Sequence, residues 1–440
     1  METLNGNQSL TIVIKLGTSS IVDERTHEPI LSILSLIVET VAKLRKNGHR
    51  VILVSSGAIG VGLRRMDIDE RPKHLPRIQA LAAVGQCRLM SLWDSLFGHL
   101  RIPVAQILLT RSDIADVGAY TYRTQYTNAQ NTFSELLDMG VLPVVNENDT
   151  LAVAEIKFGD NDTLSAITAA MVKADYLFLM TDVDCLYTAN PRHDPNAQPI
   201  EVVSDISSLE ADVSTSGSSL GTGGMGTKIV AARLATSAGV TTIITKSSKP
   251  GNVHDIVKYL QESQTGLSVS ETTSQSDPAQ QSTIKSTSSL PLPPLHTRFI
   301  PSATPIQSRS FWVLHGLAPH GSLYIDQGAF SALQKKASLL PAGVLAVEGH
   351  FGQQEAVRLF VVEKRSHIDG DFMSHAEEPR EVGRAIVNYG SLEIDRIKGV
   401  RSTHIYAVLG YADSEYVALR ENISFFPKEV PSGAATPSLR

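Results

Sequence analysis

The sequence predicts an α/β protein in which helices sandwich a mostly parallel sheet, followed by a small β-rich domain. Between residues 10 and 260, short apolar runs alternate with amphipathic segments, the order typical of parallel strands joined by helices. Beyond a Ser-, Thr- and Pro-rich stretch, short strand-like runs with turn residues between them replace that alternation. The chain has 440 residues, 42% of them hydrophobic, which is enough for two or three domains.

The strands and helices of the first domain follow from its apolar runs. The predicted strands are "LTIVIK" (10–15), "RVILVS" (50–55), "PVAQILL" (103–109), "VLPVVN" (141–146), "DYLFLM" (175–180) and "VTTIIT" (240–245). Helical patterns include residues 29–48, closed by Gly48, and residues 161–174, with Asn161 or Asp162 placed to cap the helix. In such sheets ligands bind beyond the carboxyl ends of the strands, so functional residues are expected there.

Composition shifts divide the chain into five segments. We expect a tail at 1–9, the α/β domain at 10–260, a disordered linker at 261–296, the β-rich domain at 297–426 and a disordered tail at 427–440. The linker is rich in Ser, Thr, Gln and Pro and has too few large apolar residues to form a packed fold. The runs within 321–334, 343–351, 356–364 and 404–411 are predicted as strands of the second domain.

Charge and cysteine content exclude several classes of protein. The net charge of −6 and a pI near 6.1 do not favour binding to nucleic acid or to an anionic membrane. The two cysteines are too few for a disulfide framework, and no spacing of Cys and His indicates a zinc site. No leader pattern opens the sequence and no apolar run is long enough to cross a bilayer, so a cytoplasmic protein is expected.

Lys15 interrupts the apolar run of the first predicted strand. Burying a lysine is costly unless it is paired, so this side chain is expected to meet a carboxylate or a ligand anion. The alternative is an edge strand, from which the lysine reaches water. The sequence alone leaves both interpretations open.

The second strand continues into "VSSGAIGVG", where Ser55, Ser56 and Gly57 precede a predicted helix. The free N–H groups of a helix amino terminus suit an anion such as a carboxylate or a phosphate. Ordinary capping by serine is the alternative.

Two Asn- and Asp-rich clusters, "NENDT" (146–150) and "GDND" (159–162), follow the fourth strand. Such clusters bind magnesium, bind an ammonium group, or form turns. The fifth strand leads into Thr181 and Asp182, which places these residues at the same carboxyl edge of the sheet.

The glycine-rich stretch "LGTGGMGTK" (220–228) suggests either a phosphate-binding loop or a flexible connection. Gly221 and Gly226 have P-loop spacing, but Thr227 precedes Lys228, the reverse of the P-loop order, and no strand comes before them. Two lysines, several carboxylates and glycine turns in one domain match the needs of phosphoryl transfer, which requires cations and alignment more than covalent chemistry.

Six motifs together give a specific family resemblance. In this order, "KLGTS", "VSSGAIGVG", "NENDT", "GDNDTLSA", "TDVDCLYTANPR" and "GTGGMGTK" closely resemble the glutamate 5-kinase family of the amino-acid kinase superfamily, over residues 10–260. The second domain resembles the PUA domain that follows the kinase in many members. The resemblance implies the amino-acid kinase fold plus a PUA-like barrel, and ATP-dependent phosphorylation of the side-chain carboxylate of L-glutamate, the first step toward proline.

The resemblance also implies roles for individual residues. Lys15 and Lys228 would flank the transferring phosphoryl group and Asp162 would orient both lysines, as the catalytic set. Glutamate would be held by Ser56, Gly57, Asp149 and Asn161. ATP would be contacted by Lys15, Gly17, Thr181, Asp182, Thr222, Gly223, Gly224, Met225, Gly226, Thr227 and Lys228. Mg²⁺ would bridge the phosphates without a dedicated set of protein ligands.

The expected partners and the competing functions follow from the same resemblance. Proline is expected as a feedback inhibitor, the chain as a homo-oligomer (dimer or tetramer), and a separate glutamyl-phosphate reductase as a functional partner. The first alternative is a kinase acting on acetylglutamate, aspartate or carbamate. An RNA-binding or RNA-modification protein using the PUA-like domain is a second, disfavoured because that domain lacks a basic stripe. A non-catalytic amino-acid sensor is a third, disfavoured because both lysines and Asp162 are present.

Overall fold

The computed structural model describes residues 9–110, 120–151, 161–191, 194, 196–206, 209, 224–272, 292–302, 305, 310, 313–314, 319–353, 355–362, 379–412 and 414–426. Within the helical stretches 120–125 and 264–272 only the backbone is described. The chain divides into two compact units, Met1–Thr110 with Thr127–Ile306, and Arg111–Tyr126 with Gln307–Arg440. The expected tails at 1–9 and 427–440 lie, apart from residue 9, outside the described residues.

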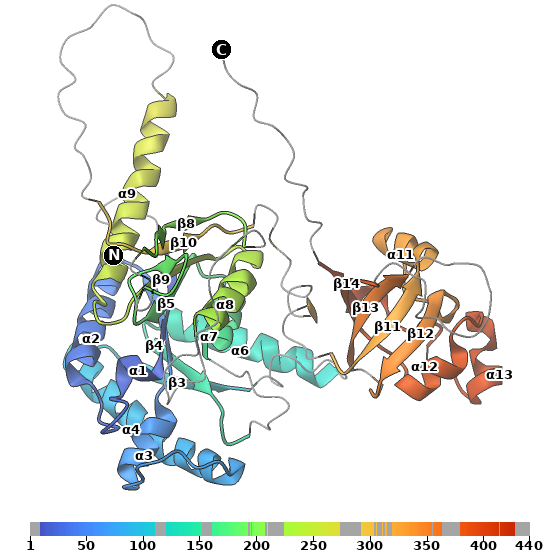
Figure 1. Cartoon of the computed structure of the whole chain (residues 1–440), viewed down its shortest axis with the longest axis horizontal. Helices are drawn as coiled ribbons and strands as arrows, with labels where there is room; N and C mark the ends of the chain where they lie inside the picture. Colours follow the sequence, from blue (N-terminus) through green and yellow to red (C-terminus); the bar gives the residue numbers. More distant parts are fainter. Residues whose placement is uncertain are drawn as a thin grey trace, which may run out of the picture. The chain divides into compact units, whose positions relative to one another are not determined.

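The first unit is built on an eight-stranded sheet in the order β3-β4-β2-β1-β5-β9-β10-β8 (Figure 1). Its strands are β1 (Thr11–Leu16), β2 (Arg50–Ser55), β3 (Val104–Leu109), β4 (Leu142–Glu147), β5 (Tyr176–Thr181), β8 (Val202–Val203), β9 (Thr241–Lys246) and β10 (Thr297–Phe299). Every pairing from β3 across to β9 is parallel, and only the pairing of β10 with β9 is antiparallel. A two-stranded ribbon, β6 (Leu186–Tyr187) with β7 (Pro199–Ile200), follows β5.

The six strands predicted for this unit are confirmed, each within a residue of its predicted bounds. Strands buried on both faces read as continuous apolar runs, which is why they were recognisable; β4 and β5 are buried at every position. The mostly parallel sheet between helices is confirmed as well.

Helices cover both faces of the sheet. They are α1 (Thr18–Ile21), α2 (Leu31–Lys46), α3 (Ala58–Arg65), α4 (Leu75–Gly98), α6 (Tyr120–Asp138), α7 (Asn161–Met171), α8 (Met225–Ser237) and α9 (Asn252–Thr272). Figure 1 shows α2 and α9 on one side and α7 and α8 on the other. Among the described residues, no helix is both long enough and apolar enough to span a membrane.

The side-chain alternation of β1 divides its residues between these two faces. Ile12, Ile14 and Leu16 belong to the apolar core formed with α2, α4 and α9. Because successive side chains of a strand point to opposite faces, Lys15 points to the other face, where α7 packs on β1. The position of Lys15 between Ile14 and Leu16 therefore directs it toward α7.

Two details of the predicted helices and boundaries need correction. The helix expected at 161–174 begins at Asn161, so Asn161 and Asp162 lie in its first turn rather than at its cap, and residue 160 lies outside the described residues. Helix α9 continues to Thr272, so residues 261–272, expected in the linker, are helical. Residues 273–291 lie outside the described residues.

The boundary expected at residue 297 also differs. Strand β10 pairs with β9 and β8 of the first sheet, so Thr297–Phe299 is part of the first unit, although the sequence placed it in the second domain. A three-residue strand after a low-complexity stretch gives no sign of which sheet it joins, because the choice depends on pairing with segments far away in the chain.

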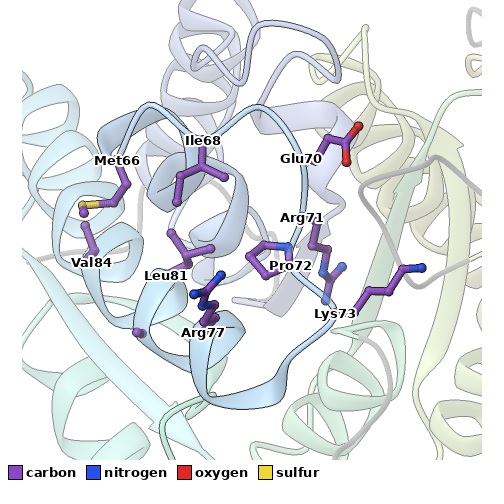
Figure 2. A pocket seen from close by; sticks show the side chains of 10 residues that line it. Met66, Ile68, Glu70, Arg71, Pro72, Lys73, Arg77, Leu81 and Val84 are labelled. Carbon is purple, nitrogen blue, oxygen red and sulfur yellow. The ribbon is translucent and has the colours of Figure 1, made fainter.

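Helices α3 and α4 pack so closely that glycine is required at their contact. A β-carbon on Gly85 of α4 would lie 1.7 Å from the carbonyl oxygen of Ala58, and one on Gly62 of α3 would lie 2.1 Å from the carbonyl oxygen of Leu81. A cavity of about 660 Å³ lies farther along this pair, between the α3–α4 connection and α4 (Figure 2). It is lined by Met66, Ile68, Glu70, Arg71, Pro72, Lys73, Arg77, Ala80, Leu81 and Val84, none of which is a predicted site residue.

The second unit contains a five-stranded sheet in the order β12-β11-β13-β14-β15. Its elements are β11 (Gly321–Asp326), α11 (Gln327–Gln334), the 3₁₀ turn Pro341–Gly343, β12 (Val344–Gly349), β13 (Ala356–Val362), β14 (Arg380–Ile386), α12 (Ser391–Ile397), the 3₁₀ turn Ser402–His404, α13 (Ile405–Leu409), the 3₁₀ turn Arg420–Asn422 and β15 (Ile423–Phe425). The strands predicted within 343–351 and 356–364 are confirmed. In the run 321–334 the strand ends at Asp326, and Gln327–Gln334, also predicted as strand, is a helix. The strand predicted within 404–411 is wrong: Ile405–Leu409 is a helix. A five-residue apolar run has no periodicity that separates a buried helix from a buried strand.

Candidate active site

Lys15, Asp162 and Lys228 form one buried cluster. The ammonium Nζ of Lys15 lies 2.6 Å from Oδ1 of Asp162, and Nζ of Lys228 lies 3.3 Å from Oδ2 of the same carboxylate. Asp162 is fully buried, and the two lysines are 5% and 6% exposed. The interpretation of Lys15 as an edge-strand lysine reaching water is wrong, because β1 lies between β2 and β5 inside the sheet.

The fold brings these three residues together from distant parts of the chain. Lys15 is the next-to-last residue of β1, near the carboxyl edge of the sheet. Asp162 lies in the first turn of α7 and Lys228 in the first turn of α8, and α7 and α8 pack against each other. Two helix amino termini and one strand end therefore converge at a single point, as expected for an anion-binding edge of a parallel sheet.

The charges of the cluster perturb its pKa values. Burial alone would raise the pKa of Asp162, but the positive charges of Lys15 and Lys228, with hydrogen bonds from Lys15 and Thr227, lower it to about 2. Burial, and then the nearby charge of Lys15, lower the pKa of Lys228. Two ammonium groups facing one carboxylate leave one positive charge of the trio uncompensated, so the cluster suits a negatively charged ligand.

The described part of the glycine-rich loop supports this cluster. Thr227 donates its hydroxyl hydrogen to Oδ2 of Asp162 at 2.7 Å and accepts the backbone N–H of Gly224 at 3.1 Å. Lys228 also donates to the carbonyl oxygen of Gly224 at 3.4 Å. Met225 and Gly226 open α8 beside these residues. The predicted ATP contacts Thr222 and Gly223 lie outside the described residues.

Asn161, the neighbour of Asp162 in the chain, connects the lysine cluster to further polar residues. Nδ2 of Asn161 donates to Oγ of Ser56 at 2.7 Å and to Oδ1 of Asn146 at 3.0 Å. The two Asn- and Asp-rich segments therefore meet, as their positions at a strand end and a helix start suggested. Gly57 caps α3 with a φ of 102°, and no side chain caps that helix, so capping by serine does not explain Ser56.

The remaining predicted residues lie at neighbouring strand ends. Gly17 directly follows β1, and a β-carbon on it would lie 3.7 Å from Nζ of Lys15, so the glycine leaves space beside that ammonium. Thr181 ends β5 and donates to Asp182 at 3.1 Å. The charge of Asp182 acts on Lys228. Asp149 is half-buried in the turn after β4.

Sequence reasoning missed two buried amides of this site. Asn146, at the end of β4, was quoted within "NENDT" but not assigned a role, although a buried asparagine at a strand end was a usable signal. Gln86 of α4 accepts a hydrogen bond from Nδ2 of Asn146 at 2.8 Å. Nothing in the local sequence marks Gln86, because its place beside Asn146 of β4 depends on how α4 packs in the fold.

The donor set does not resemble a metal cage. Among the described residues, no group of three or more His, Cys, Asp or Glu side chains is placed to hold a metal ion. The positive cluster of Lys15 and Lys228 instead favours a group that brings its own negative charges, such as a polyphosphate.

Comparison with known proteins shows the family of the chain. The model of the amino acid kinase family matches residues 10–246, and that of the PUA domain matches residues 321–409. The chain therefore belongs to the amino acid kinase family, with a PUA domain after the kinase domain.

The relatives identify a particular group within that family. A Schizosaccharomyces pombe protein called probable glutamate 5-kinase is 54% identical over 94% of this chain and 93% of its own length. A Saccharomyces cerevisiae protein described as uncharacterized is 48% identical over 96% and 99%, and a Cyanothece glutamate 5-kinase is 44% identical over 94% and 98%. Among solved structures, carbamate kinase from Giardia lamblia bound to AMP-PNP matches at 18% identity and a TM-score of 0.43, over 67% of this chain and 99% of that one.

Proposed function

We propose that this protein transfers the γ-phosphoryl group of ATP to the side-chain carboxylate of L-glutamate, the activity for which its relatives are named. The convergence of Lys15 and Lys228 on Asp162, at the carboxyl edge of the sheet, is the observation that carries the proposal. In this step the bond from the γ-phosphorus to ADP breaks and a bond from a carboxylate oxygen to phosphorus forms. The attacking carboxylate is already ionised, so no general base is needed.

The two lysines stabilise the charge that spreads over the equatorial oxygens of the moving phosphoryl group. Without Asp162, two ammonium groups this close would repel each other. Its carboxylate attracts both of them and holds them in place. Because the site is buried and preorganised, these charges act with little screening by water.

The nucleotide is proposed to lie along the glycine-rich turn. Gly17, Thr181, Asp182 and the loop from Thr222 to Lys228 would contact ATP, with glycine backbone leaving room for the phosphates. Among the described residues, no group of three or more acidic, His or Cys side chains is placed to hold a metal ion, which fits a Mg²⁺ ion held mainly by the phosphate oxygens. Bound there, Mg²⁺ would neutralise phosphate charge.

Glutamate is proposed to lie between α3 and α7. Ser56 and the backbone at Gly57 suit its carboxylate groups, because they stand where β2 runs into the amino terminus of α3. Asp149 suits its ammonium group by charge. Asn161 is next to Asp162 in α7 and donates a hydrogen bond to Ser56, so it links the residues proposed to bind glutamate to the lysine cluster.

An acyl phosphate is trapped by hydroxylamine as a hydroxamate, and this reaction tests the function. With ATP and Mg²⁺, L-glutamate is expected to give hydroxamate, and acetylglutamate, aspartate and carbamate are expected to give far less product. Preference for one of these other acceptors would replace glutamate as the substrate while keeping the kinase assignment. No glutamate-dependent product would refute the proposal.

The family resemblance supports further proposals about the location, assembly, inhibition and partner enzyme of this protein. We infer a cytoplasmic homo-oligomer that is inhibited by proline and supplies its unstable acyl phosphate to a separate reductase. Adding proline to the hydroxamate assay tests the inhibition, and measuring the mass of the assembly in solution tests the oligomeric state. Salt-dependent retention on RNA would add a role for the PUA domain, which we do not propose.

A further inference from the structure

Gln86 is a buried glutamine next to the close contact between α3 and α4. It follows Gly85, whose close approach to Ala58 fixes α4 against α3. Gln86 is 8% exposed, and its Oε1 accepts a hydrogen bond from Nδ2 of Asn146. Its Nε2 is buried and has no hydrogen-bond partner among the described residues. A buried, half-satisfied amide costs free energy, which calls for an explanation.

The amide of Asn146, the neighbour of Gln86, is held by one backbone group and by Gln86 itself. The N–H of Glu147 bonds to Oδ1 of Asn146 at 2.9 Å. A backbone N–H can only donate, so this atom of Asn146 must be the carbonyl oxygen, and its NH₂ group must face Gln86. Gln86 must in turn present its carbonyl oxygen. The backbone N–H of Glu147 and Oε1 of Gln86 therefore hold the amide of Asn146 from its two ends.

The same reasoning extends to Asn161. The oxygen of Asn146 is an acceptor, so Asn161 must approach it with its NH₂ group, whose other hydrogen goes to Oγ of Ser56. Both hydrogens of that NH₂ group are then used. The carbonyl oxygen Oδ1 is therefore the only atom of this amide left to bind a ligand, and Ser56, which accepts from Asn161, keeps its own hydroxyl hydrogen to donate.

This pattern matches an amino acid in its zwitterionic form. A carbonyl oxygen binds an ammonium group, and a hydroxyl hydrogen binds a carboxylate. If the amide of Asn161 were turned over, its NH₂ group would face the substrate ammonium, and a donor would oppose a donor. Keeping Asn161 in one orientation therefore matters for recognition of the α-amino group.

We propose that Gln86 is a positioning residue for the α-ammonium group of the substrate, acting through Asn146 to hold the carbonyl oxygen of Asn161 available to it. The inference rests on the proposed function, since it assigns a determinant of amino-acid specificity at that same site. Gln86 itself touches neither substrate nor ATP in this account. This role uses only the carbonyl oxygen of Gln86, which accepts the hydrogen bond from Asn146.

The test uses Gln86→Leu, which removes the acceptor at similar volume, and Gln86→Glu, which keeps an acceptor oxygen. In Gln86→Leu the KM for glutamate is expected to rise about tenfold, the loss from one buried hydrogen bond, while kcat and the KM for ATP stay within about twofold. The preference for glutamate over glutarate, which lacks the ammonium group, is expected to fall by a similar factor. Gln86→Glu is expected to restore the glutamate KM to within about threefold of wild type.

The matched control is Gln130→Leu. Gln130 donates to the carbonyl oxygen of Met171, at the opposite end of α7 from Asn161, so this variant makes the same chemical change without touching the amide chain. Its glutamate KM is expected to stay within about twofold of wild type. Gln86→Met, which also lacks the acceptor, takes the place of Gln86→Leu if the latter does not fold.

The outcomes separate the two proposals. A wild-type protein that forms no glutamyl hydroxamate overturns the proposed function, and the inference with it. In an active wild type, the inference about Gln86 is overturned by an unchanged glutamate KM in Gln86→Leu, by an equal rise in Gln130→Leu, or by an unchanged preference over glutarate.

Discussion

Lys15 and Asp162 form an ion pair of 2.6 Å in which both side chains are almost completely removed from water. Removing two charges from water costs several kcal/mol per ion in real proteins, and a single pair often fails to recover that cost. A second lysine, Lys228, shares the same carboxylate, so the cluster holds more positive than negative charge. Such an arrangement is poorly explained by stability and well explained by a bound anion.

Replacing Lys228 by alanine is expected to lower kcat by about a hundredfold or more, because it removes one charge from the transition state. Asp162 keeps its bonds to Lys15 and Thr227, so the fold should persist, which circular dichroism can verify. Lys249→Ala is the control, since Lys249 is an exposed lysine after β9, and its kcat should match wild type. Near-normal turnover in Lys228→Ala would remove this residue from the mechanism.

Asp162 is expected to make stability depend on pH in the acid range. Its folded pKa of about 2 lies below the ordinary value of 3.8, so its contribution is present above pH 4 and is lost as pH falls toward 2. A shift of this size corresponds to about 2 kcal/mol. Denaturant unfolding of wild type and Asp162→Asn should therefore differ most near neutral pH, and the difference should shrink below pH 4. A difference independent of pH would contradict the assignment.

Asp149→Ala is expected to raise the KM for glutamate about tenfold or more, because the substrate ammonium loses its counter-charge. The KM for ATP should change little. Steady-state kinetics with each substrate varied in turn measure both constants. Asp138→Ala, at an exposed aspartate paired with Arg50, is the control. Equal changes in the two KM values would show that Asp149 does not act on glutamate.

Gly85→Ala is expected to destabilise the protein by about 1–3 kcal/mol, because the new methyl group would meet the carbonyl oxygen of Ala58. The shift should appear as a lower midpoint in denaturant unfolding. Gly98→Ala, in the same helix but with open space around the added carbon, should leave the midpoint unchanged or raise it. If both variants unfold at the same midpoint, close packing of α3 on α4 is not important for stability.

Local sequence predicted the parts of the fold that depend on local pattern. The six strands of the first sheet were recognisable because each is a continuous apolar run between turn residues, and Lys15 was noticeable because it interrupts one of them. The helix Ile405–Leu409 was mistaken for a strand, and Thr297–Phe299 was placed in the wrong domain. Both depend on contacts made with residues far away in the chain.

The residues of the candidate site also divide into those that the sequence suggested and those that it did not. Lysines, aspartates and glycines at strand ends have few structural reasons to be there, so their residue types alone suggested a site. Gln86 and Asn146 act through the direction of their amide groups, which is set by the hydrogen bond between them and by the backbone N–H of Glu147. No sequence pattern encodes that direction, because it exists only once β4 and α4 are packed together.

The most direct test of phosphoryl transfer to a carboxylate follows the oxygen atoms. L-glutamate labelled with ¹⁸O in its side-chain carboxylate is incubated with the protein, ATP, Mg²⁺ and hydroxylamine, and the released phosphate is analysed by mass spectrometry. Hydroxylamine attacks the acyl carbon, so the bridging oxygen leaves with the phosphate. The account predicts one ¹⁸O atom in each phosphate, formed in equal amount to ADP and hydroxamate. Unlabelled phosphate would mean that water, not glutamate, accepts the phosphoryl group, and would contradict the account.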